Sequence, residues 1–185
     1  MIGRKWIVAM FVVVAGPVLA EQPAEWQLSL WGGEQHFRMN HDLHFRDENI
    51  RLDTFLNGIA MARRTPSGFL VEGSYETGFH EATEGKDTDF DIDHWSAGLG
   101  WQIDVDRMRI TPKVGVSRTR VHNDARLLLN ESGDRVFHRY FTAPYAELAI
   151  QRRLGRHWQL GGVFRNTFED FGYTRSWSFG MTVVW

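Results

Sequence analysis

The stretch from Trp177 to Trp185 constrains the fold more than any other part of the sequence. Large apolar side chains occupy every second position there, and the positions between them hold Ser, Gly, Thr and Val. The apolar set comprises Trp177, Phe179, Met181, Val183 and Trp185. A period of two places the two sets on opposite faces of a β-strand. The stretch therefore predicts a strand with one apolar face, which suits either a soluble β-sandwich or a transmembrane β-barrel.

The first twenty residues are organised like a secretory signal peptide. Arg4 and Lys5 form a short positive region, residues 6–14 are mostly apolar, and residues 18–20 end in the small side chain that a signal peptidase reads. The apolar run is too short for a transmembrane helix, which needs about 20 residues. We therefore expect residues 1–20 to be removed on export and residues 21–185 to form one outer-membrane domain.

The composition of residues 21–185 excludes several classes of function. These residues carry 19 basic and 23 acidic side chains, so the excess of positive charge that is typical of nucleic-acid binding is missing. The sequence holds no cysteine, and we expect neither a disulfide nor a lipid anchor attached through cysteine. We expect no cofactor and no nucleic-acid partner.

The alternation continues upstream and predicts eight strands in all. They are expected at about residues 26–35, 54–64, 69–79, 94–103, 108–118, 140–152, 158–167 and 174–185. The faces of the second strand are ambiguous, because its small residues Gly58, Ala60 and Ala62 favour neither face. Pro112 lies within the fifth strand and predicts a β-bulge, since proline cannot donate to the ladder.

The connections between these strands alternate in length. The long polar connections are residues 36–53, 80–92 and 119–139. The short turns, at 64–68, 104–107 and 154–157, lie between them in the chain order. The last connection, 168–173, is shorter than the other three of its set. Outer-membrane barrels have long extracellular loops and short periplasmic turns. We therefore predict an all-β chain that forms an eight-stranded antiparallel up-and-down transmembrane β-barrel, with both termini in the periplasm.

This pattern resembles the small eight-stranded outer-membrane β-barrel family that includes the OmpA membrane domain and OmpX. The final strand, which ends on the aromatic Trp185, is similar to the final strand of that family. The resemblance implies a monomer in the outer membrane, surrounded by outer-membrane lipids and lipopolysaccharide. It also implies that the barrel assembly machinery reads the five alternating apolar residues of 177–185. It implies little about function, since one fold hosts many functions. We expect a structural or surface-interaction role, with the extracellular loops as the contact surface for a ligand that the sequence does not identify.

The predicted inward faces collect charged side chains of both signs. They are Glu72, Glu76 and Glu147 against Arg109, Lys113 and Arg165. An isolated buried charge is costly, so we predict an ion-pair network that fills the lumen. The alternative is a narrow channel of low conductance, although an eight-stranded barrel is only wide enough for its own side chains.

His94 and Ser96 form a His-x-Ser pair on one strand, and Glu76 on the neighbouring strand lies within reach of His94. A serine, a histidine and a carboxylate are the groups that a hydrolase uses as nucleophile, base and orienting acid. The pair resembles the His-x-Ser of the outer-membrane lipid A deacylases, which implies hydrolysis of lipid A as an alternative function. In that family the pair faces the lipid, whereas the alternation here places His94 and Ser96 inside the barrel. We therefore predict no catalytic site.

Two of the long connections are rich in potential metal ligands. They hold His36, His41, Asp42 and His44 in the first, and His80, Glu81, Asp87, Asp89, Asp91 and Asp93 around the second. Imidazole suits transition metals and carboxylates suit calcium. His41 and His44 define no coordination geometry, and the alternating aspartates lack the glycine and terminal glutamate of an EF-hand loop. We therefore predict no metal site. We expect these loops to be solvated and to lie near anionic lipopolysaccharide, bridged to it by divalent cations.

Overall fold

The computed structural model describes residues 24–39, 51–80, 90–123, 138–169 and 172–185. The regular secondary structure of these residues is entirely β, and among them no helix is suited to span a membrane. The strands are β1 (Glu25–Met39), β2 (Arg51–Arg64), β3 (Phe69–His80), β4 (Phe90–Trp101), β5 (Ile103–Val105), β6 (Met108–Asn123), β7 (His138–Arg153), β8 (Trp158–Glu169) and β9 (Gly172–Val184). The predicted signal peptide, residues 1–20, lies outside the described residues.

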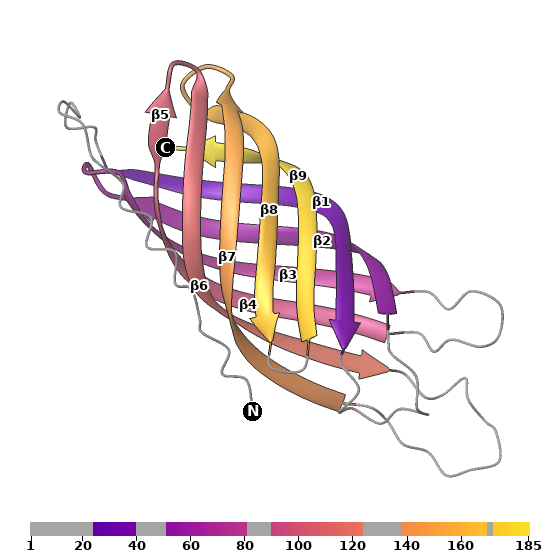
Figure 1. Cartoon of the computed structure of the whole chain (residues 1–185). Helices are drawn as coiled ribbons and strands as arrows, with labels where there is room; N and C mark the ends of the chain where they lie inside the picture. Colours follow the sequence, from indigo (N-terminus) through magenta and orange to yellow (C-terminus); the bar gives the residue numbers. More distant parts are fainter. Residues whose placement is uncertain (1–23, 40–50, 81–89, 124–137, 170–171) are drawn as a thin grey trace, which may run out of the picture.

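The strands form one antiparallel sheet that closes on itself (Figure 1). Except for β4 and β5, strands that follow one another along the chain pair with each other; β1 also pairs with β9, and β4 pairs with β6. The short β5 continues β4, since Gly100 stands opposite Lys113 before the interruption and Ile103 opposite Ile110 after it, in one register. The barrel therefore has eight strands and no free sheet edge. This confirms the predicted fold class.

The β-bulge predicted at Pro112 is not present. Pro112 stands opposite Leu148 in a β6–β7 register that contains no shift. The ladder is interrupted instead on the neighbouring strand, at Gln102 between β4 and β5. The N–H of Gln102 donates to the carbonyl oxygen of Gly68 in the β2–β3 turn, at 2.8 Å. Proline has no N–H to donate to the ladder. The adjacent strand accommodates this by breaking at Gln102, and β6 itself contains no extra residue.

Several strands continue further toward the long connections than the sequence predicted. β1 extends to Met39, β4 begins at Phe90 and β6 extends to Asn123, so parts of the polar segments expected to be loops belong to the barrel wall. The ladder uses only backbone groups, and a strand can therefore carry polar side chains once it has left the bilayer. The polar composition of these segments marks the edge of the membrane and not the end of the strands.

The two faces of the wall differ in character. Outward side chains over the middle of the barrel are exposed and apolar, among them Leu30, Ile59, Met61, Val71, Leu99, Val114, Val116, Leu148, Ile150, Phe179 and Met181. The inward face is mostly polar. In β2, whose faces were ambiguous, Ala60 and Ala62 point inward and are 2% and 4% exposed. A closed sheet with an apolar exterior and a polar interior requires a bilayer around it, and this places the chain in the outer membrane.

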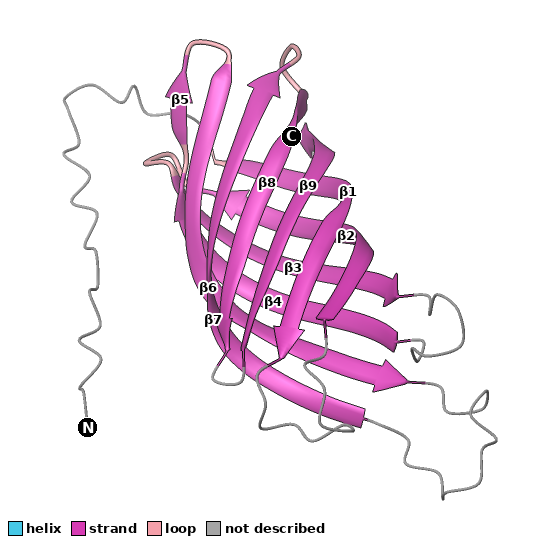
Figure 2. Cartoon of the chain, turned by 45° about the vertical axis from the view of Figure 1, so that its right-hand side comes forward, coloured by secondary structure: helices cyan, strands magenta, loops and turns pink. Residues whose placement is uncertain are grey.

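Two bands of aromatic side chains lie on the outer wall at opposite ends of the barrel. The end with the three short turns is the turn end, and the opposite end is the loop end (Figure 2). The turn-end band comprises Trp26, Trp101, Trp158 and Trp185, and the loop-end band comprises Tyr75, Trp95, Tyr140, Phe164 and Trp177. Aromatic bands of this kind lie at the two membrane interfaces, so the apolar wall between them spans the hydrocarbon core.

Candidate functional site

At the turn end, ion pairs close the mouth of the barrel. Arg109 is 1% exposed, and its Nε lies 2.7 Å from Asp104 Oδ1 while its Nη1 lies 3.4 Å from Glu25 Oε2. Arg64 is 2% exposed and approaches the same two carboxylates, at 3.8 Å from Asp104 and 3.7 Å from Glu25. Two buried guanidinium groups and two carboxylates thus form one compact cluster, in which each guanidinium faces both carboxylates.

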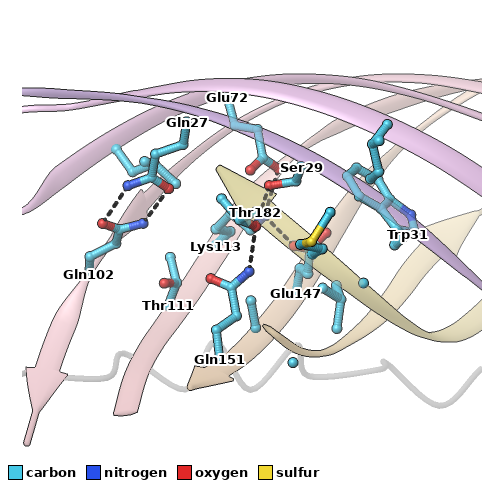
Figure 3. A pocket seen from close by; sticks show the side chains of 17 residues that line it. Gln27, Ser29, Trp31, Glu72, Gln102, Thr111, Lys113, Glu147, Gln151 and Thr182 are labelled. Carbon is cyan, nitrogen blue, oxygen red and sulfur yellow. Dashed lines mark hydrogen bonds and ion pairs between the residues drawn. The ribbon is translucent and has the colours of Figure 1, made fainter. Parts of the chain in front are cut away.

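Next to this cluster, two glutamine side chains bridge the lumen. Gln27 Nε2 donates to Gln102 Oε1 at 3.0 Å, and Gln102 Nε2 donates to Gln27 Oε1 at 2.9 Å. On the far side of this pair lies a cavity of about 30 Å³, which Figure 3 shows with Ser29, Gln151 and Thr182 along it. A polar cavity of this size has room for a water molecule or two. It is too small for a solute.

The centre of the lumen holds five of the six charged residues predicted to pair there. Lys113 Nζ lies 2.6 Å from Glu72 Oε1 and also contacts the carboxylate of Glu147. Arg165 lies 2.6 Å from Glu147 Oε2 through Nη2 and 2.8 Å from Glu76 Oε2 through Nη1. All five side chains are buried. The structure places the sixth predicted residue, Arg109, in the turn-end cluster instead, with Glu25 and Asp104 as its partners.

Strand pairing and ring contacts together fix this central network. Lys113 and Glu147 are register partners on β6 and β7, and Glu147 and Arg165 are partners on β7 and β8. Tyr145 from β7 lies against the guanidinium of Arg165, with the ring centroid 4.6 Å from Cζ. From β1, Trp31 Nε1 donates to Glu76 Oε1 at 3.0 Å. Both carboxylate oxygens of Glu76 are therefore engaged, Oε1 by Trp31 and Oε2 by Arg165.

The proposed hydrolase residues lie close together but do not form a triad. Gln35 Nε2 donates to His94 Nε2 at 2.6 Å, and His94 Nδ1 lies 2.8 Å from Thr119 Oγ1. Ser96 hydrogen-bonds to Ser74 across β3 and β4. Glu76 stands opposite His94 in the register, but its carboxylate contacts Trp31 and Arg165. Both ring nitrogens of His94 are engaged, and the pair is buried in the lumen away from lipid.

An apolar row lines one side of the lumen at the loop end. Leu56, Ile92 and Val121 point inward and are at most 1% exposed. Leu56 stands opposite Gly78, Gly78 opposite Ile92, and Ile92 opposite Val121, so the four residues form one continuous row over β2, β3, β4 and β6. Gly78 has no side chain, and Leu56 Cδ2 occupies the place where its Cβ would stand. Buried apolar side chains thus line the lumen on the extracellular side of the polar network.

On the outer wall at the loop end lies a polar and aromatic patch that was not predicted. Tyr75 Oη donates to Asp93 Oδ1 at 2.7 Å, and Arg120 Nε donates to Asp93 Oδ2 at 2.8 Å. The Tyr75 and Trp95 ring centroids are 5.6 Å apart, and Arg120 Cζ lies 5.7 Å from the Trp95 ring. Asp93 is therefore only 3% exposed, although it points outward.

Two further residues extend this outer-wall patch toward β7. Arg118 Cζ lies 4.8 Å from the Tyr140 ring centroid, and the register places Arg118 beside Trp95 and Tyr140 beside Arg120. The outer-wall patch thus comprises Tyr75, Asp93, Trp95, Arg118, Arg120 and Tyr140. The alternation of β4 could have indicated that Asp93 shares the outward face of Trp95. Its place in a polar stretch favoured a loop instead.

The described residues contain no group of three or more histidines, aspartates or glutamates that could hold a metal ion. His36, Asp91 and Asp93 lie on strands, and His80 is the last residue of β3. The other potential ligands, His41, Asp42, His44, Glu81, Asp87 and Asp89, lie outside the described residues.

A closed eight-stranded antiparallel barrel with an apolar belt, two aromatic bands and a polar interior is an outer-membrane β-barrel. No family model matches the sequence, and no curated protein does. The structure is similar to that of Ail, the attachment invasion locus protein of Yersinia pestis, in complex with the heparin analogue sucrose octasulfate. The two are 12% identical, the match covers 89% of this chain and 100% of Ail, and the TM-score is 0.64.

Two further solved structures share the fold. Neisserial surface protein A is 12% identical over 88% of this chain and 99% of its own, with a TM-score of 0.66. The outer membrane protein OprG from Pseudomonas aeruginosa is 10% identical over 89% of this chain and 97% of its own, with a TM-score of 0.61. These likenesses confirm the predicted resemblance to small eight-stranded outer-membrane barrels. At such identities they show the fold alone.

Proposed function

We propose that this barrel has a structural and surface-interaction role, and that it neither conducts solutes nor catalyses a reaction. The observation that carries this proposal is the filled interior. An ion-pair cluster, a glutamine pair, a buried network around Lys113 and Arg165, and the row of Leu56, Ile92 and Val121 follow one another along the lumen. The parts of the chain that remain available for contact are therefore the outer wall and the loops.

A narrow channel is less favoured than a closed barrel. A conducting path would have to separate Arg165 from Glu76 and Glu147, and it would also have to move the apolar row at the loop end. Burying a charge whose partner has moved away is costly, and apolar constrictions exclude water. Both barriers lie on the same path.

Lipid A hydrolysis is the other alternative, and the geometry favours it less. A serine nucleophile needs a base within hydrogen-bond reach and an exposed position at the substrate. Ser96 is paired with Ser74, while His94 is held by Gln35 and Thr119. Neither side chain reaches the lipid-facing surface, because both point into the lumen.

We propose that lipopolysaccharide binds the outer-wall patch at the loop end. Arg118 is exposed, and the described residues offer it the Tyr140 ring but no carboxylate. A guanidinium with free donors binds phosphate in a bidentate manner. The Asp93–Arg120 pair and the rings of Tyr75 and Trp95 hold the surface beside it in place. Arg118 is therefore the residue proposed to contact the phosphates of the outer-leaflet glycolipid.

The loops favour a different kind of ligand from the one bound to Ail. The four connections at 40–50, 81–89, 124–137 and 170–171 carry eleven acidic and four basic side chains. The heparin analogue in the Ail structure is a polyanion, and a strongly acidic set of loops repels polyanions. We propose that these loops contact basic ligands, or anionic neighbours through bridging divalent cations.

Fluorescently labelled lipopolysaccharide added to the purified protein in detergent tests this proposal. We expect saturable binding, weakened on the order of fivefold in Arg118→Gln, because one charged contact near an anionic surface contributes about that much. Arg107→Gln at the turn end removes the same charge far from the patch and should bind as the wild type does. Equal loss in both variants would contradict a site at the patch. Release of fatty acid by the wild type but not by Ser96→Ala would establish the hydrolase instead.

A further inference from the structure

The turn end carries more positive charge than its own carboxylates neutralise. Its described residues, at 24–27, 62–69, 101–109, 151–160 and 183–185, hold seven arginines and three carboxylates. Arg64, Arg109 and Arg153 face Glu25 and Asp104. The remaining carboxylate, Asp106, is exposed in the β5–β6 turn.

Four arginines at this end are left without a carboxylate partner within the described part of the chain. They are Arg63, Arg107, Arg152 and Arg156, and all four are exposed. Arg63 continues the outward face of β2, and Arg152 continues the outward face of β7, so both stand beside the membrane and not in the lumen. The loop connections have the opposite, acidic balance.

The outward arginines flank a row of tryptophans. Arg63 is the register partner of Trp26, and its Cζ lies 5.5 Å from the Trp26 ring centroid. Trp26 and Trp185 exchange two backbone hydrogen bonds, at 2.9 and 3.0 Å. Trp158 follows on β8, opposite Val183. Around the barrel from β2 through β1 and β9 to β8, the order on the outer wall is therefore Arg63 followed by three tryptophans.

The same arc continues onto β7. Arg152 stands opposite Leu160 on β8 and opposite Met108 on β6, on the outward face at the level of the turns. Arg156 lies in the β7–β8 turn, two residues before Trp158. We call these six residues the arginine–tryptophan arc: Arg63, Trp26, Trp185, Trp158, Arg156 and Arg152. Arginines thus stand on both sides of three interfacial tryptophans along a single stretch of the outer wall.

We propose that the arginine–tryptophan arc is a binding surface for anionic phospholipid headgroups of the inner leaflet of the outer membrane. Outer-membrane barrels keep their short turns in the periplasm, so this end meets the phospholipid leaflet. Indole rings lie at the glycerol level, and arginines extend from an apolar wall toward the phosphates. A guanidinium binds a phosphate through two parallel hydrogen bonds.

The position of the arc argues for a lipid and against a polymer beneath the membrane. Arg63 is held over a tryptophan that is 41% exposed on the lipid-facing wall. A ligand that contacts both residues must therefore lie beside the barrel, with apolar chains next to Trp26 and a negative charge next to Arg63. Peptidoglycan is anionic but carries no such chains. A phospholipid with a net negative headgroup meets both requirements.

Native mass spectrometry of the purified protein with added phosphatidylglycerol or phosphatidylcholine tests this inference. The wild type should bind phosphatidylglycerol preferentially, and added salt should weaken the preference. In the double variant Arg63→Gln/Arg152→Gln, the apparent affinity for phosphatidylglycerol should fall about fivefold for each arginine removed. Arg63→Lys/Arg152→Lys keeps the charge and should retain most of the preference. Heat-dependent migration on a detergent gel checks that each variant is folded.

Arg107→Gln is the matched control, because it removes an exposed arginine at the same end of the barrel but outside the arc. It should retain the preference for phosphatidylglycerol. The inference is overturned if the double variant keeps wild-type affinity, or if Arg107→Gln loses as much as the double variant does. It is also overturned if the double variant binds phosphatidylglycerol normally but no longer sediments with purified peptidoglycan sacculi. None of these readouts depends on the role proposed for the loop end.

Discussion

Arg165 Nη1 lies 2.8 Å from Glu76 Oε2, and this ion pair joins β8 to β3 across the interior of the barrel. The two strands are not neighbours in the sheet, so no backbone hydrogen bond connects them. Glu147 on β7 accepts the other side of the same guanidinium, at 2.6 Å. One buried cation therefore ties three strands together and occupies the centre of the lumen.

Arg165→Ala should strongly destabilise the barrel. The substitution leaves Glu76 and Glu147 buried with less compensation, and breaking a buried ion pair by removing one partner costs about 3–5 kcal/mol. Urea unfolding in detergent micelles measures this loss as a change in the free energy of unfolding. Arg156→Ala removes an exposed arginine and should change that free energy by less than about 0.5 kcal/mol. Similar losses in the two variants would mean that the central network adds little to stability.

Gly58→Ala should displace Trp31 from its position in the lumen. A Cβ on Gly58 would overlap the indole ring of Trp31, whose Nε1 donates to Glu76. Forcing a methyl group into a filled interior costs about 1–3 kcal/mol. Gly73→Ala is the matched control, because Gly73 faces outward and the nearest atom to its added Cβ is at 4.0 Å. Tryptophan fluorescence and urea unfolding should change in the first variant only.

Asp93→Asn should destabilise the outer-wall patch. It weakens the hydrogen bonds that the carboxylate accepts from Tyr75 and Arg120, and leaving their donors partly unsatisfied costs about 1–3 kcal/mol. Asp91→Asn, two residues earlier on the same outward face, changes an exposed carboxylate and should be nearly neutral. If the two substitutions had equal effects on urea unfolding, the buried position of Asp93 would have no energetic consequence.

Trypsin added to intact cells should cut at the loop end and spare the turn end. The connections 40–50 and 124–137 contain Arg46, Arg126 and Arg135, whereas Arg64, Arg107 and Arg156 lie at or near the short turns. Mass spectrometry of the released peptides identifies the sites. Cleavage after Arg107 or Arg156 in intact cells would mean that the barrel is inserted in the opposite orientation.

The sequence predicted the wall of the barrel well and the contacts inside it poorly. The alternation from Trp95 to Ile103 indicated which side chains face the lipid, because a strand turns its side chains with a period of two whatever lies around it. The alternation also placed Lys113 and Arg165 in the lumen. The alternation could not predict which of these charged residues form ion pairs. Arg165 contacts Glu76 because the closed barrel sets the height of each strand relative to the strands across the lumen.

Two of the sequence predictions were wrong for the same reason: a polar residue or a proline was interpreted as a disruption of the strand. Asp93 was expected in a loop, yet it continues β4 because Tyr75 and Arg120 satisfy its carboxylate on the outer wall. Pro112 was expected to cause a bulge, yet the adjacent strand is interrupted at Gln102 instead. In both cases residues of a neighbouring strand make the observed structure possible. The pattern of a single strand does not show what its neighbours contribute.

Single-channel recording in planar bilayers tests the central claim, a barrel whose interior is filled, most directly. The folded protein should insert and leave the current at its baseline, because the Lys113–Arg165 network and the row of Leu56, Ile92 and Val121 block the lumen in series. Heat-dependent migration of the same sample on a detergent gel shows that the protein is folded. Reproducible current steps from the wild-type protein, altered in size by Lys113→Ala, would contradict the closed barrel and establish a channel through its centre.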